Sequence, residues 1–206
     1  GGAMLSPNLA EEVKGTLGDV LYNLYGTSET GLNIIATPED LTYSTRIIGK
    51  GIKGVKLRIV NPLQENVERG TIGQLWVNSK GSMVNPQQHW ISTGDLSYQD
   101  ANGYYFLAGR QDDMIVSAGE NVYPIHVENI LLEHPLIEDV AVIGIPDEQF
   151  GQRLQAFIQK KKGADITQAS YFEWLQSKVA RYEMPKEITF IDSIPYTALG
   201  KKDKRQ

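Results

Sequence analysis

The spacing of apolar residues changes once along this chain, and that change constrains the fold more than any other feature. Between residues 55 and 108 apolar and polar side chains alternate, which is the pattern of strands with one buried face. Beyond Gly109, helical spacing appears between short apolar runs. A chain of 206 residues has room for two small domains with real cores. We therefore expect two folded units, residues 5–111 and residues 112–206.

The first of these units is expected to begin with a helix and to continue mainly as strands. Ser6 is a typical N-cap, and Pro7 suits the first position of a helix that would end soon after Lys14. The apolar run 20–25 predicts a buried strand, whereas residues 31–54 contain several Gly and a Pro and predict loop. The spacing of the later strands predicts a small antiparallel β-barrel or sandwich.

The second unit is expected to mix helices and strands, which makes the fold class α+β. Thr167 is a typical N-cap, and apolar residues follow it at helical spacing. Two helices are predicted, at residues 124–134 and 167–180, and four strands, at 114–116, 140–145, 154–158 and 188–191.

The composition argues against several classes of function. The formal net charge is −5 and no basic run exceeds a few residues, whereas non-specific nucleic-acid binding needs a positive surface. No apolar run approaches the ~20 residues that span a bilayer, so we expect no membrane span. The absence of cysteine removes disulfides and thiolate nucleophiles and is compatible with a reducing compartment, so we expect a cytoplasmic protein.

The first motif with chemical content is Tyr25-Gly-Thr-Ser-Glu29, which follows the apolar run 20–25. The hydroxyls of Thr27 and Ser28, together with backbone N–H groups, can be aimed at a phosphate. Glu29 could hold Mg²⁺, which prefers one or two carboxylates plus phosphate oxygens. The alternative is a hydroxyl-rich turn with a solvated glutamate.

Two further motifs carry Asp95 and Arg110. Asp95 ends Ser92-Thr-Gly-Asp, which is expected to form a turn between strands, and a carboxylate there can accept the two hydroxyls of a ribose. Alternatively, Asp95 only stabilises its own turn. Arg110 has donors fixed in a fork that suits phosphate or ribose oxygens, and the alternative for it is a polar linker held by an ion pair.

The last motifs lie in the second unit. Ala118 and Gly119 form a small-residue loop that a ligand could approach closely, or simply a hairpin turn. Lys201 follows Gly200 near the chain end, where a mobile ammonium could stabilise charge that develops on a phosphoryl group. Lys202 and Lys204 are expected to be solvated and to tolerate substitution by Ala.

Together and in this order, these motifs resemble the later motifs of the acyl-adenylate-forming ligases, the AMP-forming acyl-CoA synthetases. Gly73-Gln-Leu-Trp76 matches a further motif, and the resemblance extends from about Leu5 to Arg205. It implies an enzyme that uses ATP and Mg²⁺ to activate a carboxylic acid as an acyl-adenylate and then transfers the acyl group to CoA, and the expected acid is a fatty acid. Residues 112–124 look like the fatty-acyl and aryl-CoA ligase branch.

The resemblance also implies a role for each candidate residue. The first unit would supply the nucleotide contacts, with Tyr25 stacking on adenine, Ser28 on the α-phosphate, Asp95 on the ribose hydroxyls and Arg110 on ribose or phosphate. Thr27 would also contact the nucleotide, and Glu29 would bind Mg²⁺. The second unit would act as a mobile lid, with Asp112 as its hinge, Lys201 bridging carboxylate and α-phosphate, and the loop at Ala118 and Gly119 lining the path of CoA.

The chain departs from the family pattern in one large respect. The phosphate loop of the family, a Ser/Thr/Gly-rich stretch that ends in Lys, should precede Tyr25, and the sequence holds no such stretch. We therefore expect an upstream N-terminal domain of the same parent protein as a partner, and a chain that is incompetent by itself. The alternatives are an amino-acid-adenylating domain of a peptide synthetase, or a non-catalytic remnant that serves as an interaction module.

Overall fold

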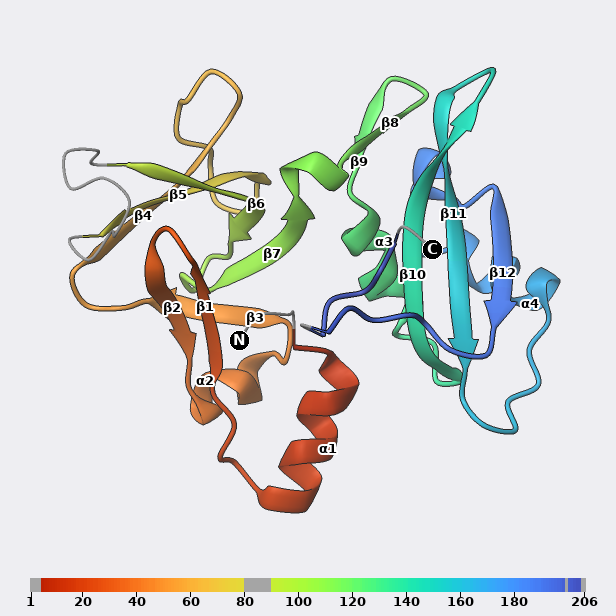
Figure 1. Ribbon diagram of the computed structural model, residues 1–206, viewed down its shortest axis with the longest axis horizontal. Helices are drawn as coiled ribbons and strands as arrows, with labels where there is room; N and C mark the ends of the chain where they lie inside the picture. The colour runs from red at the N-terminus through yellow and green to blue at the C-terminus, as the bar shows by residue number, and fades with distance from the viewer. Residues whose placement is uncertain (1–4, 80–89, 199, 205–206) are drawn as a thin grey trace. The chain divides into compact units, whose positions relative to one another are not determined.

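The computed structural model describes residues 5–79, 90–198 and 200–204. Its contacts divide the chain into two compact units, Gly1–Gln111 and Asp112–Gln206, which are called the first and the second unit below (Figure 1). Each unit has its own sheet and its own buried apolar cluster.

The first unit begins with the predicted helix, α1 (Pro7–Leu17). Its N-cap is Ser6, whose hydroxyl accepts a hydrogen bond from the N–H of Leu9 at 3.1 Å, as an N-cap should. The helix ends at Gly18, which adopts a positive φ of 76°. The predicted capped helix is confirmed, although it extends past Lys14.

The sheet of the first unit is antiparallel throughout, in the order β1-β2-β3-β7-β6-β5-β4. Among the described residues the path runs from β1 to β4 without closing. The predicted barrel is therefore wrong, and the sandwich alternative is not confirmed. The strands are β1 (Asn23–Thr27), β2 (Gly31–Ala36), β3 (Ile47–Gly51), β4 (Val55–Val60), β5 (Gly73–Ser79), β6 (Ile91–Gln99) and β7 (Tyr105–Arg110).

Two sequence predictions for this unit are wrong. Residues 31–54 are not mainly loop, because they form β2, the helix α2 (Pro38–Tyr43) and β3. Gly49 misled the prediction: its φ is 110°, and a Cβ there would lie 2.0 Å from the carbonyl oxygen of Ile35. This glycine marks close approach of two strands and not a loop. The run 20–25 is also not a buried strand, since β1 starts later and Val20 is 58% exposed.

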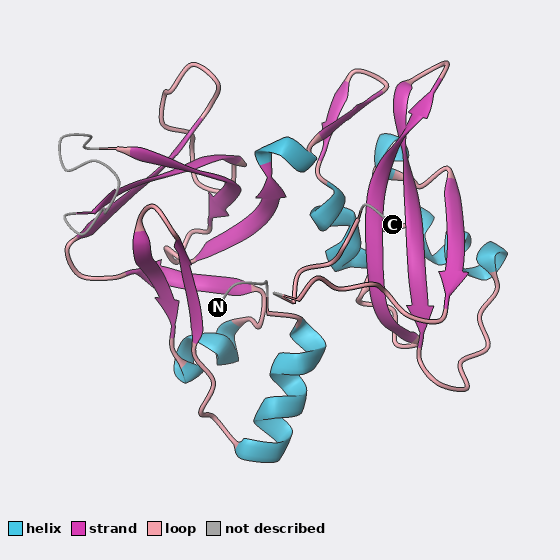
Figure 2. Ribbon diagram, in the orientation of Figure 1, coloured by secondary structure: helices cyan, strands magenta, loops and turns pink. Residues whose placement is uncertain are grey.

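The second unit is a mixed α+β structure, as predicted (Figure 2). Its sheet has the order β10-β11-β8-β9, and β12 pairs with β11 in parallel. The strands are β8 (Ile115–Ser117), β9 (Glu120–Val122), β10 (Ile137–Asp147), β11 (Gly151–Lys160) and β12 (Glu187–Ile191). Apolar side chains of the sheet and of its helices form one core, with Val127, Leu131, Val142, Leu154 and Leu175 at full burial.

Both helices of the second unit are shorter than predicted. They are α3 (Pro124–Leu131) and α4 (Gln168–Gln176), and the hydroxyl of Thr167 caps α4 as expected. Short 3-10 turns, η1 (Gln111–Asp113) and η2 (Arg181–Glu183), complete the unit. In the part of the chain that the structure describes, no helix has both the length and the apolar composition that crossing a bilayer requires.

Substitution of Gly49 tests the strand assignment that the sequence missed. Gly49→Ala should lower the free energy of unfolding by at least about 2 kcal/mol, because the new Cβ meets the Ile35 carbonyl at a positive φ. The matched change Gly15→Ala, in α1 with no atom near the new Cβ, should raise it by about 0.5–1 kcal/mol. Urea unfolding followed by circular dichroism measures both, and equal effects would contradict the assignment.

Candidate functional site

Asp95 lies inside β6, so the prediction of a turn between two strands at this point is wrong. Antiparallel pairing places Asp95 directly opposite Arg110 of β7. The guanidinium Nη1 of Arg110 is 3.4 Å from Oδ1 of Asp95, an ion pair whose acidic side chain is only 12% exposed and whose basic side chain is 52% exposed. Opposite charges directly across two strands stabilise their pairing, and the exposed guanidinium can also reach a ligand.

Tyr25 brings a third strand, β1, to the same carboxylate. Its hydroxyl donates to Oδ2 of Asp95 at 2.6 Å, while its ring lies in the core beside Ile34 and Leu75. Burial raises the pKa of Tyr25 above its usual value, and the negative charge of Asp95 raises that pKa further. The residue is 8% exposed, and its role as a stacking platform for adenine stays a prediction.

The turn between β1 and β2 carries Ser28 and Glu29, directly after Thr27 at the end of β1, and a network of hydrogen-bonded hydroxyls supports it. The hydroxyls of Thr27 and Thr30 lie 2.9 Å apart, and Nδ2 of Asn33 donates to the Thr30 hydroxyl at 2.6 Å. Asn33 is fully buried. Thr30 and Asn33 were not predicted from the sequence, although an asparagine inside the apolar run Leu32-Asn-Ile-Ile35 is a visible signal.

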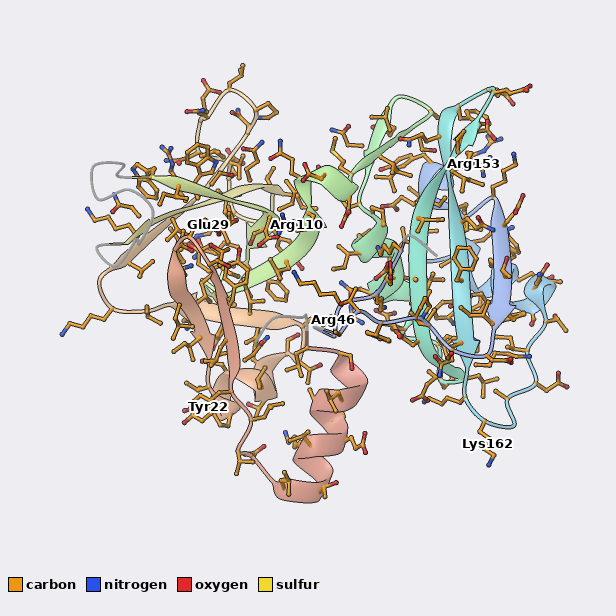
Figure 3. All side chains as sticks on the ribbon, viewed as in Figure 1. Tyr22, Glu29, Arg46, Arg110, Arg153 and Lys162 are labelled. Atoms are coloured by element: carbon orange, nitrogen blue, oxygen red, sulfur yellow. The ribbon has the colours of Figure 1, made fainter. Side chains whose placement is uncertain are left out.

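Glu29 and Ser28 are exposed at this turn, and Figure 3 shows Glu29 and Arg110 on the same unit. The pKa of Glu29 lies below its usual value, mainly because the Thr27 hydroxyl donates to its carboxylate, with a smaller contribution from the charge of Arg110. The described residues contain no cluster of three His, Asp or Glu that could hold a metal by itself. A single ionised carboxylate nevertheless fits Mg²⁺ that takes its other ligands from phosphate and water.

The first unit therefore brings most of the sequence-predicted residues to one place. Asp95, Arg110 and Tyr25 are joined through one carboxylate, and Glu29 is close enough to Arg110 for its pKa to respond. Thr93 supports the arrangement from β6, because its hydroxyl donates to the carbonyl of Leu75. Thr93 belongs to the motif Ser92-Thr-Gly-Asp95, but no role was predicted for it.

Ala118 and Gly119 form the two-residue tip of the β8–β9 hairpin. Ser117 pairs with Glu120 across the turn, and both central residues have positive φ, 55° at Ala118 and 84° at Gly119. This is the pattern of a type I′ turn, in which alanine is strained and glycine is not. The hairpin-turn reading is correct as a description, and the role of the loop toward CoA stays a prediction.

Asp112 is the first residue of the second unit and lies exposed in η1. Its place at the division between the units is compatible with a hinge. The hinge itself stays a prediction.

Lys201 is exposed, but the segment around it is not a frayed tail. The chain turns back at this point: the N–H of Thr197 donates to the carbonyl of Lys201 at 2.7 Å, and Tyr196 pairs with Lys202. The prediction that Lys202 and Lys204 are solvated is wrong. Their ammonium groups bind Glu128, at 3.5 Å and 2.7 Å, and Glu128 is 4% exposed.

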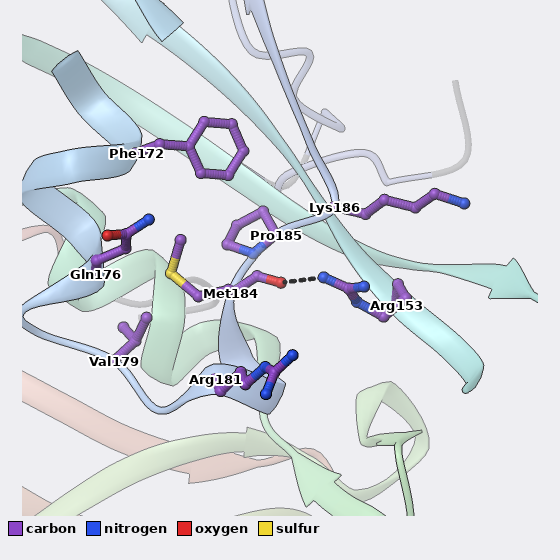
Figure 4. Close-up of a pocket in the computed structure, with 8 residues that line it drawn as sticks. All are labelled: Arg153, Phe172, Gln176, Val179, Arg181, Met184, Pro185 and Lys186. Carbon is purple, nitrogen blue, oxygen red and sulfur yellow. Dashed lines mark hydrogen bonds between the residues drawn. The ribbon is translucent and has the colours of Figure 1, made fainter. Parts of the chain in front are cut away.

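A cavity of about 620 Å³ lies in the second unit beside α4 and η2 (Figure 4). Arg153, Arg181 and Lys186 give its wall a positive charge, and Phe172 contributes an apolar surface. The guanidinium of Arg153 donates to the carbonyl of Met184 at 3.4 Å. None of the sequence-predicted site residues lines this cavity.

Both units of the chain are similar to proteins of known families. The model of the AMP-binding enzyme family matches residues 1–84, and that of the AMP-binding enzyme C-terminal domain matches residues 126–201. An indoleacetate–CoA ligase of Aromatoleum aromaticum is 34% identical over 196 residues, which cover 89% of this chain and 38% of that protein. The chain spans less than half the length of the curated relatives that it matches.

Solved structures show the same likeness. An amide bond synthetase, McbA from Marinactinospora thermotolerans, has a TM-score of 0.90 at 29% identity, and the match covers 98% of this chain and 44% of that one. ATP-bound MatB from Rhodopseudomonas palustris has a TM-score of 0.83 at 29% identity, with coverage of 98% and 42%.

The bond between Tyr25 and Asp95 predicts a pH-dependent stability. At pH 7, Tyr25→Phe should lower the free energy of unfolding by about 1.5–3 kcal/mol, because a hydrogen bond to a carboxylate is lost. Above pH ~10, tyrosine in the unfolded chain ionises while folded Tyr25 keeps its proton, so the wild type loses up to about 1.4 kcal/mol per pH unit from this group.

The difference in stability between the wild type and Tyr25→Phe should therefore shrink as the pH rises from 10 to 11. Urea unfolding at several pH values measures it. Tyr22→Phe, at a side chain that is 58% exposed, controls for the loss of a hydroxyl. A difference that stays constant with pH would contradict the assigned bond.

Proposed function

Because the chain belongs to the family of AMP-binding enzymes, we propose that its first unit binds an adenosine nucleotide at Asp95. The observation that carries this proposal is the surroundings of the Asp95 carboxylate on β6. Tyr25 of β1 donates its hydroxyl to this carboxylate, and the guanidinium of Arg110 of β7 forms an ion pair with it. These donors fix the orientation of the carboxylate, as a site for the paired hydroxyls of a ribose requires.

The remaining residues of the first unit complete a nucleotide site in this proposal. Arg110 offers its fork of donors to phosphate or ribose oxygens. The β1–β2 turn presents Thr27 and Ser28 toward the α-phosphate, and Tyr25 contributes at the adenine. Glu29 would hold Mg²⁺, which neutralises phosphate charge when it is bound.

The reaction that we propose for the whole protein is that of an AMP-forming acid–thiol ligase. The oxygen of a carboxylic acid attacks the α-phosphorus of ATP and pyrophosphate leaves, which gives an acyl-adenylate. The thiol of CoA then attacks the acyl carbon, AMP leaves, and the thiol proton passes to solvent. The names of the relatives support a carboxylic acid in general, and a fatty acid in particular stays a prediction.

In this proposal Lys201 acts in the first step, where negative charge develops on the phosphoryl oxygens. It lies exposed on a turn of defined shape, so its ammonium is available to a substrate. The second unit would rotate about Asp112 between the two steps, and the Ala118–Gly119 turn would then lie along the path of CoA.

The chain by itself should bind ATP weakly. The contacts that we assign to ribose and α-phosphate are present, but the sequence holds no Ser/Thr/Gly-rich loop ending in Lys for the outer phosphates. Several charge-assisted hydrogen bonds of about 1.5–3 kcal/mol each are missing, so we expect a dissociation constant near ~1 mM. Calorimetry tests this expectation, and micromolar binding would contradict our assignment of the missing loop.

Lys201→Ala tests the proposed reaction in the complete protein from which this sequence comes. Adenylation, followed as pyrophosphate release, should slow by about 10²–10³, the usual effect of losing an electrostatic donor at a reacting centre. Formation of acyl-CoA from a supplied acyl-adenylate should be largely spared. Lys162→Ala, at an exposed lysine of the same unit, is the matched control (Figure 3). Equal losses in both steps, or no loss, would contradict the role of Lys201.

A further inference from the structure

Side chains form hydrogen bonds with the backbone groups along the outer edge of β10. β10 lies at the end of its sheet, so the backbone groups that face away from β11 need other partners. The N–H of Val140 donates to the carboxylate of Asp139 at 2.8 Å, and the N–H of Val142 donates to Oε1 of Glu128 at 2.9 Å. The carbonyls of the same two valines accept hydrogen bonds from the ammonium groups of Lys202 and Lys204.

Glu128 is the centre of this edge. It lies on α3 with its side chain 5% exposed, among the residues that the helix turns toward the core. Its carboxylate accepts from the Val142 N–H and from the Lys204 ammonium, and it lies 3.5 Å from the Lys202 ammonium. Lys202 also forms an ion pair with Asp139 at 2.9 Å, so two carboxylates face two ammonium groups and the cluster is neutral.

The cluster also fixes the turn that carries Lys201. Residues 195–203 fold back on themselves, since the N–H of Asp203 donates to the Pro195 carbonyl at 2.9 Å. Lys202 and Lys204 both contact Glu128, whereas Lys201 is exposed. The lysine that precedes the two anchored lysines is therefore the one that remains exposed.

We propose that Glu128 is a positioning residue for Lys201, because it binds Lys202 and Lys204 and so holds the 195–204 segment against the edge of β10. The proposal rests on the proposed function of Lys201 in adenylation. Glu128 touches no substrate in this account and acts only through the two lysines.

Hydrogen exchange of this chain tests the structural half of the proposal. Glu128→Gln keeps an acceptor for the Val142 N–H but removes the charge that binds the lysines. The amides of Thr197, Gly200 and Asp203, which donate within the 195–204 segment, should then exchange at least ~10-fold faster. Amides shared between β10 and β11 should be unchanged.

Two further variants distinguish the loss of these ion pairs from a general loss of folding. The double variant Lys202→Met and Lys204→Met removes the ion pairs from the other side and leaves the core residue in place, so it should speed exchange of the same amides. Glu133→Gln breaks the ion pair with Lys178, 3.0 Å long in the same unit, and should leave the 195–204 segment unaffected. Unchanged exchange in both Glu128→Gln and the double variant overturns the proposal.

The functional half of the proposal, that Glu128 positions Lys201 for adenylation, is tested by the rate of adenylation by the complete protein. Glu128→Gln should lower kcat for pyrophosphate release at least ~10-fold with KM for ATP nearly unchanged, because the lysine is displaced while the nucleotide contacts remain. Lys204→Arg, which keeps the charge and can still bind Glu128, should retain most of the rate. Faster exchange with an unchanged kcat overturns the positioning role. An unsubstituted protein that forms no acyl-adenylate overturns the proposed function instead, and the exchange data still decide whether Glu128 holds the segment.

Discussion

Burying a carboxylate away from water costs several kcal/mol unless donors surround it, and Asp95 in the first unit and Glu128 in the second are buried carboxylates. In the first unit Asp95 meets the hydroxyl of Tyr25 and the guanidinium of Arg110. These three residues come from β6, β1 and β7. The contacts of the Asp95 carboxylate therefore form only when these three strands are correctly aligned with one another. The polar end of the sheet, where we place the nucleotide, is a consequence of that requirement.

The second unit satisfies the same requirement differently. Glu128 contacts the 195–204 segment, which is not a strand of the sheet, and its charge is matched by Lys202 and Lys204. The ammonium groups also satisfy carbonyls at the edge of β10, which protects an otherwise open edge. Ion pairs therefore organise the segment that carries Lys201, which is mobile in the sequence-based expectation and ordered in the structure.

Local signals predicted where the helices begin and the mixed character of the second unit, because caps such as Ser6 and Thr167 act within one turn. The errors came from long-range contacts. Gly49 looked like a loop residue because its neighbour in space, Ile35, is distant in sequence. Asp95 was predicted to lie in a turn, and Lys204 in a solvated tail. Their ion-pair partners, Arg110 and Glu128, lie in other segments, and no sequence spacing indicates these contacts.

The central claim is that the residues around Asp95 bind an adenosine nucleotide. Titration of the isotopically labelled chain with AMP, followed by amide NMR, tests it most directly. We predict that the largest shift changes occur at Ser28, Asp95 and Arg110, and that Asp95→Asn removes them while Asp113→Asn, at an exposed aspartate of the second unit, does not. Absence of shifts at these three residues, or shifts confined to the second unit, would contradict the account.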